Sequence, residues 1–254
     1  MSRIILENID LEFRVDAMKH DTFRSAFVRL LRRGTSRRIK TLQSVSLRIE
    51  EGERVGLIGH NGAGKTTLLK VIAGIYPPQR GIVYTEGRVC PLFEVITGFE
   101  WDANGWENIR TRALLLGMSP RDIDRRIDSI GEFSNLGDFL DIPVRHYSAG
   151  MHLRLAFATS AAVDPEILLL DEVMATGDIA FMEAARYRMN DLMERASIVI
   201  FATHSLDVLP KFCERTILLD HGRVVADGPT REIVKLYADS ARAVPGAMSE
   251  DDES

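Results

Sequence analysis

Residues 59–66, Gly-His-Asn-Gly-Ala-Gly-Lys-Thr, have the composition and spacing of a loop that binds phosphate groups. They fit the pattern GxxxxGK[ST], and the apolar residues on either side supply the strand and the helix that this pattern requires. Glycines are needed because successive backbone N–H groups must curl around phosphate oxygens, where a Cβ would obstruct them. At the positive end of the following helix, Lys65 can reach the β- and γ-phosphates and the Thr66 hydroxyl can bind Mg²⁺. We therefore predict that the chain binds a nucleoside triphosphate through the following residues: Gly59, His60, Asn61, Gly62, Ala63, Gly64, Lys65, Thr66 and Thr67.

Two acids follow an apolar strand further along the chain. Residues 167–170 are Ile-Leu-Leu-Leu, and Asp171 and Glu172 come directly after them. A carboxylate at the end of a buried strand beside a phosphate loop can hold Mg²⁺ through its water shell, which is the role expected of Asp171. Glu172 can orient and partly deprotonate the water that attacks the γ-phosphate. Two acids at a strand end are weak evidence alone, since such ends are often merely solvated, but the phosphate loop upstream favours hydrolysis.

The composition is that of an ordinary globular protein. The 254 residues are 45% hydrophobic, which is enough to bury a sizeable core. The net charge of −5 argues against a general nucleic-acid binder. Cys90 and Cys213 lack CxxC spacing, which favours reduced thiols in a cytoplasmic protein. Since no window approaches the roughly 20 apolar residues of a membrane span and the start lacks a signal-peptide pattern, we expect any membrane connection to come through a partner.

Hydrophobic periodicity separates strand-forming regions near the two ends from a helical region in the middle. We expect strands at residues 4–13, 42–49, 54–58, 81–89, 167–170 and 198–202, and a hairpin over 216–227. We expect helices at residues 106–116, 120–133, 151–163, 178–195 and 231–237. The helix at 178–195 is the expected crossover between two parallel strands. The pattern predicts an α/β domain over residues 1–242, with an antiparallel β portion, an inserted helical portion at about 91–163 and a disordered acidic tail at 243–254.

A basic segment lies between the first two expected strands. Residues 19–40 contain eight Lys or Arg and one acid, Asp21. Apolar residues fall there at i, i+3, i+4, i+7 and i+8, namely Phe23, Ala26, Phe27, Leu30 and Leu31. Residues 22–33 are therefore an expected amphipathic basic helix. Its apolar stripe packs on its own domain in one interpretation and against anionic lipid or a membrane partner in another, and nucleic acid is a weaker third alternative.

Taken together, these features resemble the ATP-binding subunits of ABC transporters. The signature motif of that family, usually written LSGGQ, resembles Tyr147-Ser148-Ala149-Gly150-Met151, which precedes a helix leading into the strand that ends in two acids. A Ser hydroxyl, glycine N–H groups and a helix N-terminus can together bind an anion. The resemblance implies that Ser148 and Gly150 bind the γ-phosphate held by the opposite subunit, in a head-to-tail homodimer with two sandwiched ATP molecules.

The resemblance assigns roles to further residues. Asp178 is similar to the acid that crosses the dimer interface, and His204 to the histidine that contacts the γ-phosphate. Phe13 aligns with the aromatic residue that stacks on adenine, and packing in the core is its alternative role. Lys65, Glu172 and His204 are thus the expected catalytic residues.

The sequence also departs from the usual family pattern. Ala149 replaces a usual glycine, and Met151 replaces a usual glutamine. Glu94 stands where the family normally carries the glutamine that touches Mg²⁺ and couples to the membrane domain. Glu94 can still ligate Mg²⁺ beside Thr66 and Asp171, but its negative charge would alter the affinity for the metal.

These departures are informative, because they resemble one branch of the family: the cassettes of O-antigen, capsule and teichoic-acid exporters. The segments that carry this resemblance are Phe93-Glu94-Val95 with Gly98-Phe99, residues 147–151 with 154–158, and Asp171-Glu172-Val173 with Gly177-Asp178. The branch implies ATP hydrolysis that drives export of a lipid-linked polysaccharide through a separate integral membrane subunit. It also implies peripheral binding at the cytoplasmic face of the inner (plasma) membrane. Some members carry a C-terminal carbohydrate-binding domain, and since the chain ends soon after the cassette, we expect that it does not read the glycan's end.

Other classes of function remain open. The chain could be an ABC cassette for another exported substrate. A soluble ABC ATPase of DNA repair or translation would carry a long coiled-coil insertion or two cassettes, whereas the sequence has one phosphate loop and no heptad run. A regulatory module would hold ATP without turning it over.

The basic segment generates a first testable prediction. If residues 22–33 lie against the membrane, reversing Arg29, Arg32 and Arg33 to Glu should weaken membrane association and export, because each basic residue near an anionic surface contributes about 1 kcal/mol. Cell fractionation and an export assay measure both effects. Unchanged association and export would refute the membrane interpretation of this helix.

Overall fold

The computed structural model describes residues 1–15, 37–92, 98–171 and 179–242. The basic helix expected at 22–33 and the tail at 243–254 lie outside these ranges, as do three expected site residues: Glu94, Glu172 and Asp178. Their roles, and the domain bounds given above, stay predictions. Among the helices of the described ranges, none combines the length and the apolar character needed to span a bilayer.

A six-stranded sheet forms the centre of the fold. Its order is β5-β6-β7-β3-β8-β9, and every neighbouring pair is parallel except β8 and β9. The strands are Val89–Pro91 (β5), Ile167–Asp171 (β6), Ile198–Ala202 (β7), Arg54–Ile58 (β3), Arg215–Asp220 (β8) and Arg223–Pro229 (β9). Helix α6, Ile179–Arg195, connects β6 to its parallel neighbour β7, as predicted. The carboxyl ends of β3, β6 and β7 therefore share one edge of the sheet, where the residues that follow them can meet.

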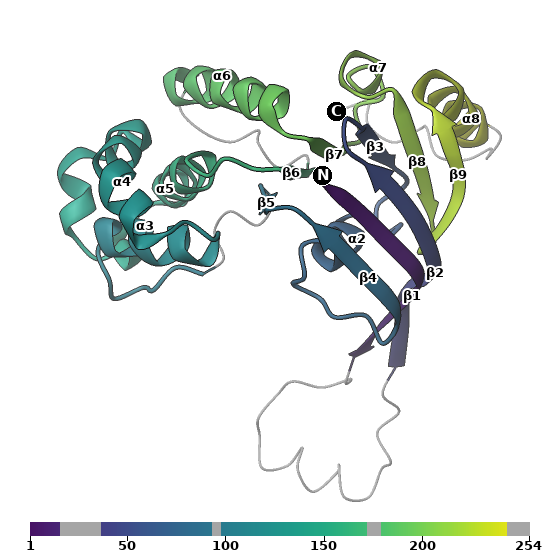
Figure 1. Cartoon of the computed structure of the whole chain (residues 1–254), viewed down its shortest axis with the longest axis horizontal. Coiled ribbons are helices and arrows are strands. Elements are labelled where there is room, and N and C mark those ends of the chain that lie inside the picture. Colours follow the sequence, from purple (N-terminus) through teal and green to yellow (C-terminus); the bar gives the residue numbers. More distant parts are fainter. Residues whose placement is uncertain (16–36, 93–97, 172–178, 243–254) are drawn as a thin grey trace, which may run out of the picture.

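A second, antiparallel sheet packs against the first. It contains β1 (Arg3–Val15), β2 (Arg37–Glu50) and β4 (Arg80–Glu86) in the order β2-β1-β4. Helix α2, Lys65–Ile72, lies among the strands of the two sheets (Figure 1), and apolar residues of all three share one core. Alternate residues of β6 contribute to this core and to a second core on the opposite face, which is why the strand is apolar up to Leu170. The predicted α/β fold with an antiparallel β portion is confirmed.

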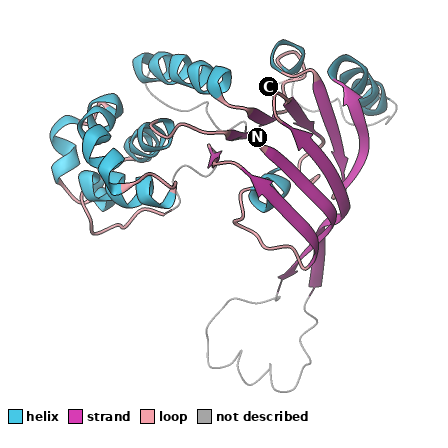
Figure 2. Ribbon diagram, viewed as in Figure 1, coloured by secondary structure: helices cyan, strands magenta, loops and turns pink. Residues whose placement is uncertain are grey.

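A group of helices stands apart from the sheets, at the left of Figure 2. It contains α3 (Gly105–Leu115), α4 (Pro120–Ser134), α5 (Ala149–Ala161) and two short 3-10 helices, η1 (Gly137–Asp141) and η2 (Val144–His146). Asn104 and Glu107 form a capping box at the start of α3, and Ser119 caps α4 ahead of Pro120. These helices are the inserted helical portion expected from the sequence. Two further helices, α7 (Leu209–Phe212) and α8 (Thr230–Arg242), pack on β3 and β8 in a separate apolar cluster.

The expectation of one strand at residues 81–89 is wrong. The chain forms β4 in the antiparallel sheet up to Glu86 and then β5 in the six-stranded sheet from Val89. Gly87 lies between them with a φ of 117°, and a Cβ there would lie 3.0 Å from side-chain oxygens of Ser2 and Glu166. Only Gly87 and Arg88 separate the two strands, and periodicity alone does not reveal so short a break.

Helices α3 and α4 approach each other closely at Gly131. A Cβ on Gly131 would lie 2.3 Å from the indole ring of Trp106. The indole Nε1 donates a hydrogen bond to Asp141 Oδ1 at 3.0 Å. The ring therefore cannot turn away from an added methyl group without losing this bond.

We expect Gly131→Ala to lower the free energy of unfolding by about 1–2 kcal/mol, because overpacking against the indole outweighs the gain in helix propensity. Urea denaturation measures the change. The matched control is Gly228→Ala, whose Cβ would lie at an ordinary distance of 3.7 Å from Ile233 and should alter stability by less than about 0.5 kcal/mol. Equal effects of the two substitutions would contradict this account of the packing.

Candidate functional site

Two structural features require glycine in the phosphate loop: positive φ angles and close contacts with neighbouring backbone. Gly59, Gly62 and Gly64 have φ values of 147°, 84° and 108°, which disfavour residues with a side chain. A Cβ on Gly59 would lie 2.1 Å from the Leu219 carbonyl oxygen, and one on Gly64 would lie 2.8 Å from that of Thr41. Gly62 has open space around it. The sequence pattern specifies Gly59 and Gly64, and these two glycines also allow close packing against β8 and β2.

Lys65 is buried and bonded to the loop itself. Its Nζ donates to the carbonyl oxygens of Gly59 at 2.7 Å and His60 at 3.2 Å. Lys65 also begins α2, whose N-cap is Gly64 and has no side-chain cap. The first N–H groups of this helix therefore have no capping side chain, and together with the ammonium group they suit a phosphate anion.

Thr66 and Asp171, the two residues expected to hold Mg²⁺, lie in contact. Thr66 Oγ1 donates a hydrogen bond to Asp171 Oδ2 at 2.6 Å, although the residues are 105 positions apart. Asp171 is the last residue of β6, and Thr66 lies in the first turn of α2. A hydroxyl and a carboxylate this close fit the hard oxygen ligands that Mg²⁺ prefers.

His204 follows β7 at the same edge of the sheet. The backbone N–H of Thr203 bonds to Leu57 O of β3 at 3.3 Å, and the N–H of Ser205 bonds to Thr203 Oγ1 at 3.0 Å. The His204 side chain between them is exposed. The chain after β7 is thus held beside the strand that leads into the phosphate loop.

The turn between β8 and β9 is hydrogen-bonded to the phosphate loop. We did not predict this contact from the sequence. Gly222 donates its N–H to Ala63 O at 2.9 Å and accepts from Gln43 N at 2.8 Å. A Cβ on Gly222 would lie 2.4 Å from the Thr41 carbonyl oxygen. The sequence showed the turn, but only the sheet order brings it against the loop.

Ser148 and Gly150 lie at the start of α5, a helix that stands apart from α2 in Figure 1. Ser148 caps the helix by accepting a hydrogen bond from Met151 N at 3.3 Å, and both residues are exposed. The structure does not bring them to the phosphate loop of their own chain. This separation is the one that a site shared between two subunits requires.

Behind Ser148, an aromatic cluster surrounds a residue that we did not single out. His152 is 6% exposed, and its ring centroid lies 5.2–5.6 Å from those of Phe99, Trp101 and Tyr147. Its Nδ1 lies 3.0 Å from Ser148 O, which also accepts from the His152 backbone N–H. His152 therefore positions Ser148 through its carbonyl. In the sequence, only the position of His152 directly after the signature-like motif could have indicated this role.

Phe13 is half-exposed near the end of β1. Its ring meets Tyr76 edge-on, with centroids 5.3 Å apart, and 36% of the residue is exposed. Lys70 lies over the face of Tyr76 at 5.1 Å. The alternative of a core residue does not fit this exposure, and a partly exposed ring beside α2 leaves room for stacking on a base.

Burial governs the pKa values at the junction of the helices with the central sheet. It raises the pKa of the Cys90 thiol to about 12, and it lowers the pKa of the nearby Arg112 guanidinium to about 10. Burial likewise raises the pKa of Cys213 to about 12. Both thiols are free and neutral near pH 7, so neither is suited to nucleophilic chemistry.

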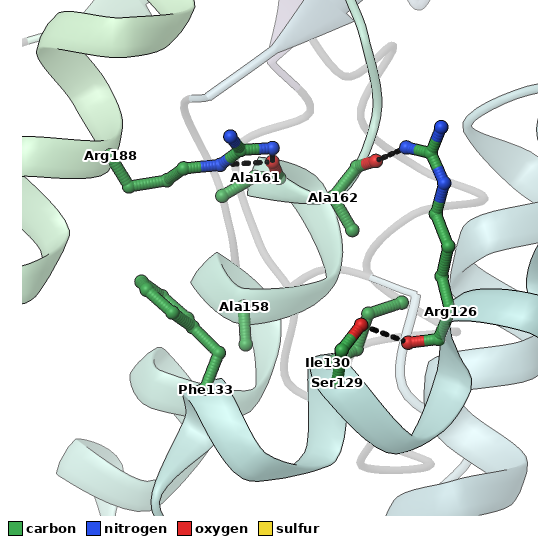
Figure 3. Close-up of a pocket in the computed structure, with 8 residues that line it drawn as sticks. All are labelled: Arg126, Ser129, Ile130, Phe133, Ala158, Ala161, Ala162 and Arg188. Carbon is green, nitrogen blue, oxygen red and sulfur yellow. Dashed lines mark hydrogen bonds between the residues drawn. The ribbon is translucent and has the colours of Figure 1, made fainter.

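A cavity of about 470 Å³ lies between α4, α5 and α6 and is distinct from the phosphate loop (Figure 3). Two arginines line it, but both already bond to backbone oxygens. Arg126 donates to Ala162 O at 2.8 Å, and Arg188 donates twice to Ala161 O, at 3.0 and 2.7 Å. These arginines cap the end of α5, which favours a structural role over nucleotide binding.

We expect Gly59→Ala to abolish ATP binding and to destabilise the fold by about 2 kcal/mol or more, because its Cβ would collide with the Leu219 carbonyl. Gly62→Ala, which meets only the cost of its positive φ, should cost about 1–2 kcal/mol. Thermal unfolding and fluorescence of a labelled ATP analogue measure both effects. If Gly59→Ala were the milder substitution, the close approach of the loop to β8 would not constrain it.

Comparisons with known proteins agree with this geometry. Residues 42–175 match the family described as ABC transporter. The chain is 41% identical to the O-antigen export system ATP-binding protein RfbE of Yersinia enterocolitica, over 88% of this chain and 97% of that protein. It is 38% identical to RfbB of Myxococcus xanthus over 98% of this chain, and it spans 60% of the length of that relative. The teichoic acids export ATP-binding protein TagH of Listeria innocua is 34% identical, over 92% of this chain and 69% of that protein.

Solved structures show the same fold. The dimeric structure of MJ0796, a bacterial ABC transporter cassette, matches with a TM-score of 0.65 at 22% identity, over 90% of this chain and 99% of that chain. The resemblance to O-antigen and teichoic-acid cassettes that we predicted from the sequence is confirmed by the relatives above. The chain therefore belongs to the ABC transporter family, whose ATP-binding cassettes are ATPases.

Proposed function

We propose that this chain hydrolyses ATP to drive export of a lipid-linked polysaccharide, such as O-antigen, capsule or teichoic acid, through a separate integral membrane subunit. The observation that carries the hydrolytic part is the 2.6 Å contact between Thr66 of the phosphate loop and Asp171 at the end of β6. The substrate class is supported by relatives named for O-antigen and teichoic-acid export.

ATP binds with its phosphates on residues 59–67 and its adenine against Phe13. Lys65 exchanges the carbonyl oxygens of Gly59 and His60 for the β- and γ-phosphates, since an ammonium group bonds more strongly to an anion than to a neutral carbonyl. Thr66 and Asp171 hold Mg²⁺, with Glu94 as a further oxygen ligand. The metal ion neutralises charge on the phosphate oxygens.

Hydrolysis takes place at the shared edge of β3, β6 and β7. Glu172 follows Asp171 directly and acts as the base that orients and deprotonates the attacking water. His204, exposed after β7, contacts the γ-phosphate. The expected division of roles is thus Mg²⁺ binding for Asp171 and water activation for Glu172.

Two copies of the chain complete each site. Ser148 and Gly150 of one copy bind the γ-phosphate held by the other, and Asp178 crosses between them. The support is the position of Ser148, which is exposed at the positive end of α5 and apart from its own phosphate loop. ATP binding then closes the homodimer, and hydrolysis reopens it.

The chain works at the cytoplasmic face of the inner membrane as a peripheral subunit. The names of the relatives, which describe ATP-binding proteins of export systems, support an integral membrane partner. That partner converts the opening and closing of the dimer into movement of the glycan. No nucleic acid takes part.

We expect Glu172→Gln to lower ATP turnover at least about 100-fold, because the water loses its base. The variant should still bind ATP and should accumulate as an ATP-bound dimer. Phosphate release and light scattering with Mg²⁺ and ATP measure the two effects.

The matched control is Glu166→Gln, which changes an exposed carboxylate just before β6, at the opposite end of the strand from Asp171. It should retain wild-type turnover. Absence of turnover in the wild-type complex would refute the enzymatic proposal and favour a module that only holds ATP. Normal surface glycan in cells that carry Glu172→Gln as the only copy would refute the proposed substrate class.

A further inference from the structure

Two histidines and an aspartate meet where the phosphate loop touches the β8–β9 turn. His60 lies in the loop, Asp220 ends β8 and His221 lies in the turn. One possible ligand atom from each of the three lies within 4.8 Å of the others. None of the hydrolytic roles proposed above uses these side chains.

The distances fit a shared cation. His60 Nε2 lies 3.0 Å from Asp220 Oδ1, and His221 Nε2 lies 3.9 Å from the same oxygen. In a tetrahedral site with bonds of about 2.05 Å, neighbouring ligand atoms lie about 3.3 Å apart. The two measured distances fall on either side of that value. The His221 side chain is 80% exposed and can turn to close the difference.

The Nε2 of His60 faces the Asp220 carboxylate at ion-pair distance but makes no hydrogen bond with it. Its Nδ1 lies 2.7 Å from Asn61 O, which can only accept, so this nitrogen carries the proton of a neutral ring. Nε2 is buried, and no group in the described ranges of the chain hydrogen-bonds to it. In a neutral ring, Nε2 and Asp220 Oδ1 would then be two acceptors 3.0 Å apart. A cation between them removes this conflict.

We propose that His60, Asp220 and His221 bind a divalent transition-metal ion of the Zn²⁺ type. Two imidazoles and a carboxylate suit Zn²⁺, Ni²⁺ or Cu²⁺, whereas Mg²⁺ and Ca²⁺ prefer oxygen ligands. The bond from His60 Nδ1 to a backbone carbonyl is the outer-shell contact that orients a metal-binding imidazole. A fourth position remains for water.

The location gives the metal a regulatory role. The turn already holds the loop through the bond from Gly222 N to Ala63 O, and His60 O accepts from both Lys65 Nζ and Ala63 N. A metal on the His60 side chain adds a second attachment between the same two segments. Occupancy therefore restricts the movement of the phosphate loop and slows turnover.

The test uses the full chain without nucleotide, titrated with Zn²⁺ in excess Mg²⁺ by calorimetry. We expect one Zn²⁺ per wild-type chain. His221→Asn, in which asparagine tolerates the φ of 44° at this position, should weaken binding at least about tenfold. Asp220→Asn should weaken it similarly. The matched control is His146→Asn, which removes an exposed imidazole in another part of the fold and should bind Zn²⁺ as the wild type does.

Three outcomes would overturn the site: no Zn²⁺ binding by the wild type, equal binding by the wild type and His221→Asn, or nitrogen NMR showing a protonated His60 Nε2 that Zn²⁺ does not displace. In the last case a proton is the shared cation.

A second readout, the rate of ATP hydrolysis, rests on the proposed function. Zn²⁺ should slow the wild type and not His221→Asn, whereas Zn²⁺ acting in place of Mg²⁺ would slow both. The binding titration needs no activity, so failure of the metal site and failure of the ATPase proposal are distinguishable.

Discussion

The structure depends on the close fit of the phosphate loop between the carbonyl oxygens of two different sheets. Gly59 approaches Leu219 O of the six-stranded sheet, and Gly64 approaches Thr41 O of the antiparallel sheet, at distances that admit no Cβ. The loop is therefore positioned by both sheets at once. A shift of one sheet against the other would move the loop N–H groups that are expected to bind the phosphates. The geometry of the nucleotide site therefore depends on the packing of the core between the sheets.

That constraint also fixes the metal-binding edge of the proposed site. Thr66 is carried by α2, which packs in the core between the sheets, and Asp171 is carried by β6, two strands away from β3 in the same sheet. Their side chains meet at 2.6 Å because β3, β7 and β6 are parallel and in register at their carboxyl ends. An oxygen pair already this close would need little rearrangement to hold Mg²⁺.

Local patterns predicted the parts of this site that are contiguous in sequence. The spacing of residues 59–66 identified the loop, and the apolar run before Asp171 identified the strand end. Periodicity failed at Gly87, because the chain changes sheets within two residues, between Glu86 at the end of β4 and Val89 at the start of β5. The contact of Gly222 with the loop and the aromatic surroundings of His152 also escaped prediction, because they depend on strand order and helix packing between distant segments. The spacing of residues in the sequence does not predict such contacts unless they belong to a known motif.

Helix α5 links the two halves of the proposed composite site. Ser148 caps its first turn, and Ala161 O at its last turn accepts two hydrogen bonds from Arg188 of α6. Helix α6 begins at Ile179, directly after the segment that contains Glu172 and Asp178. A helix of 13 residues is about 20 Å long, so α5 joins Ser148 at its first turn to the Arg188 contact at its last turn. In the proposed dimer, α5 and Arg188 would form the direct structural connection between the segment that follows Asp171 and the Ser148 that faces the partner's nucleotide.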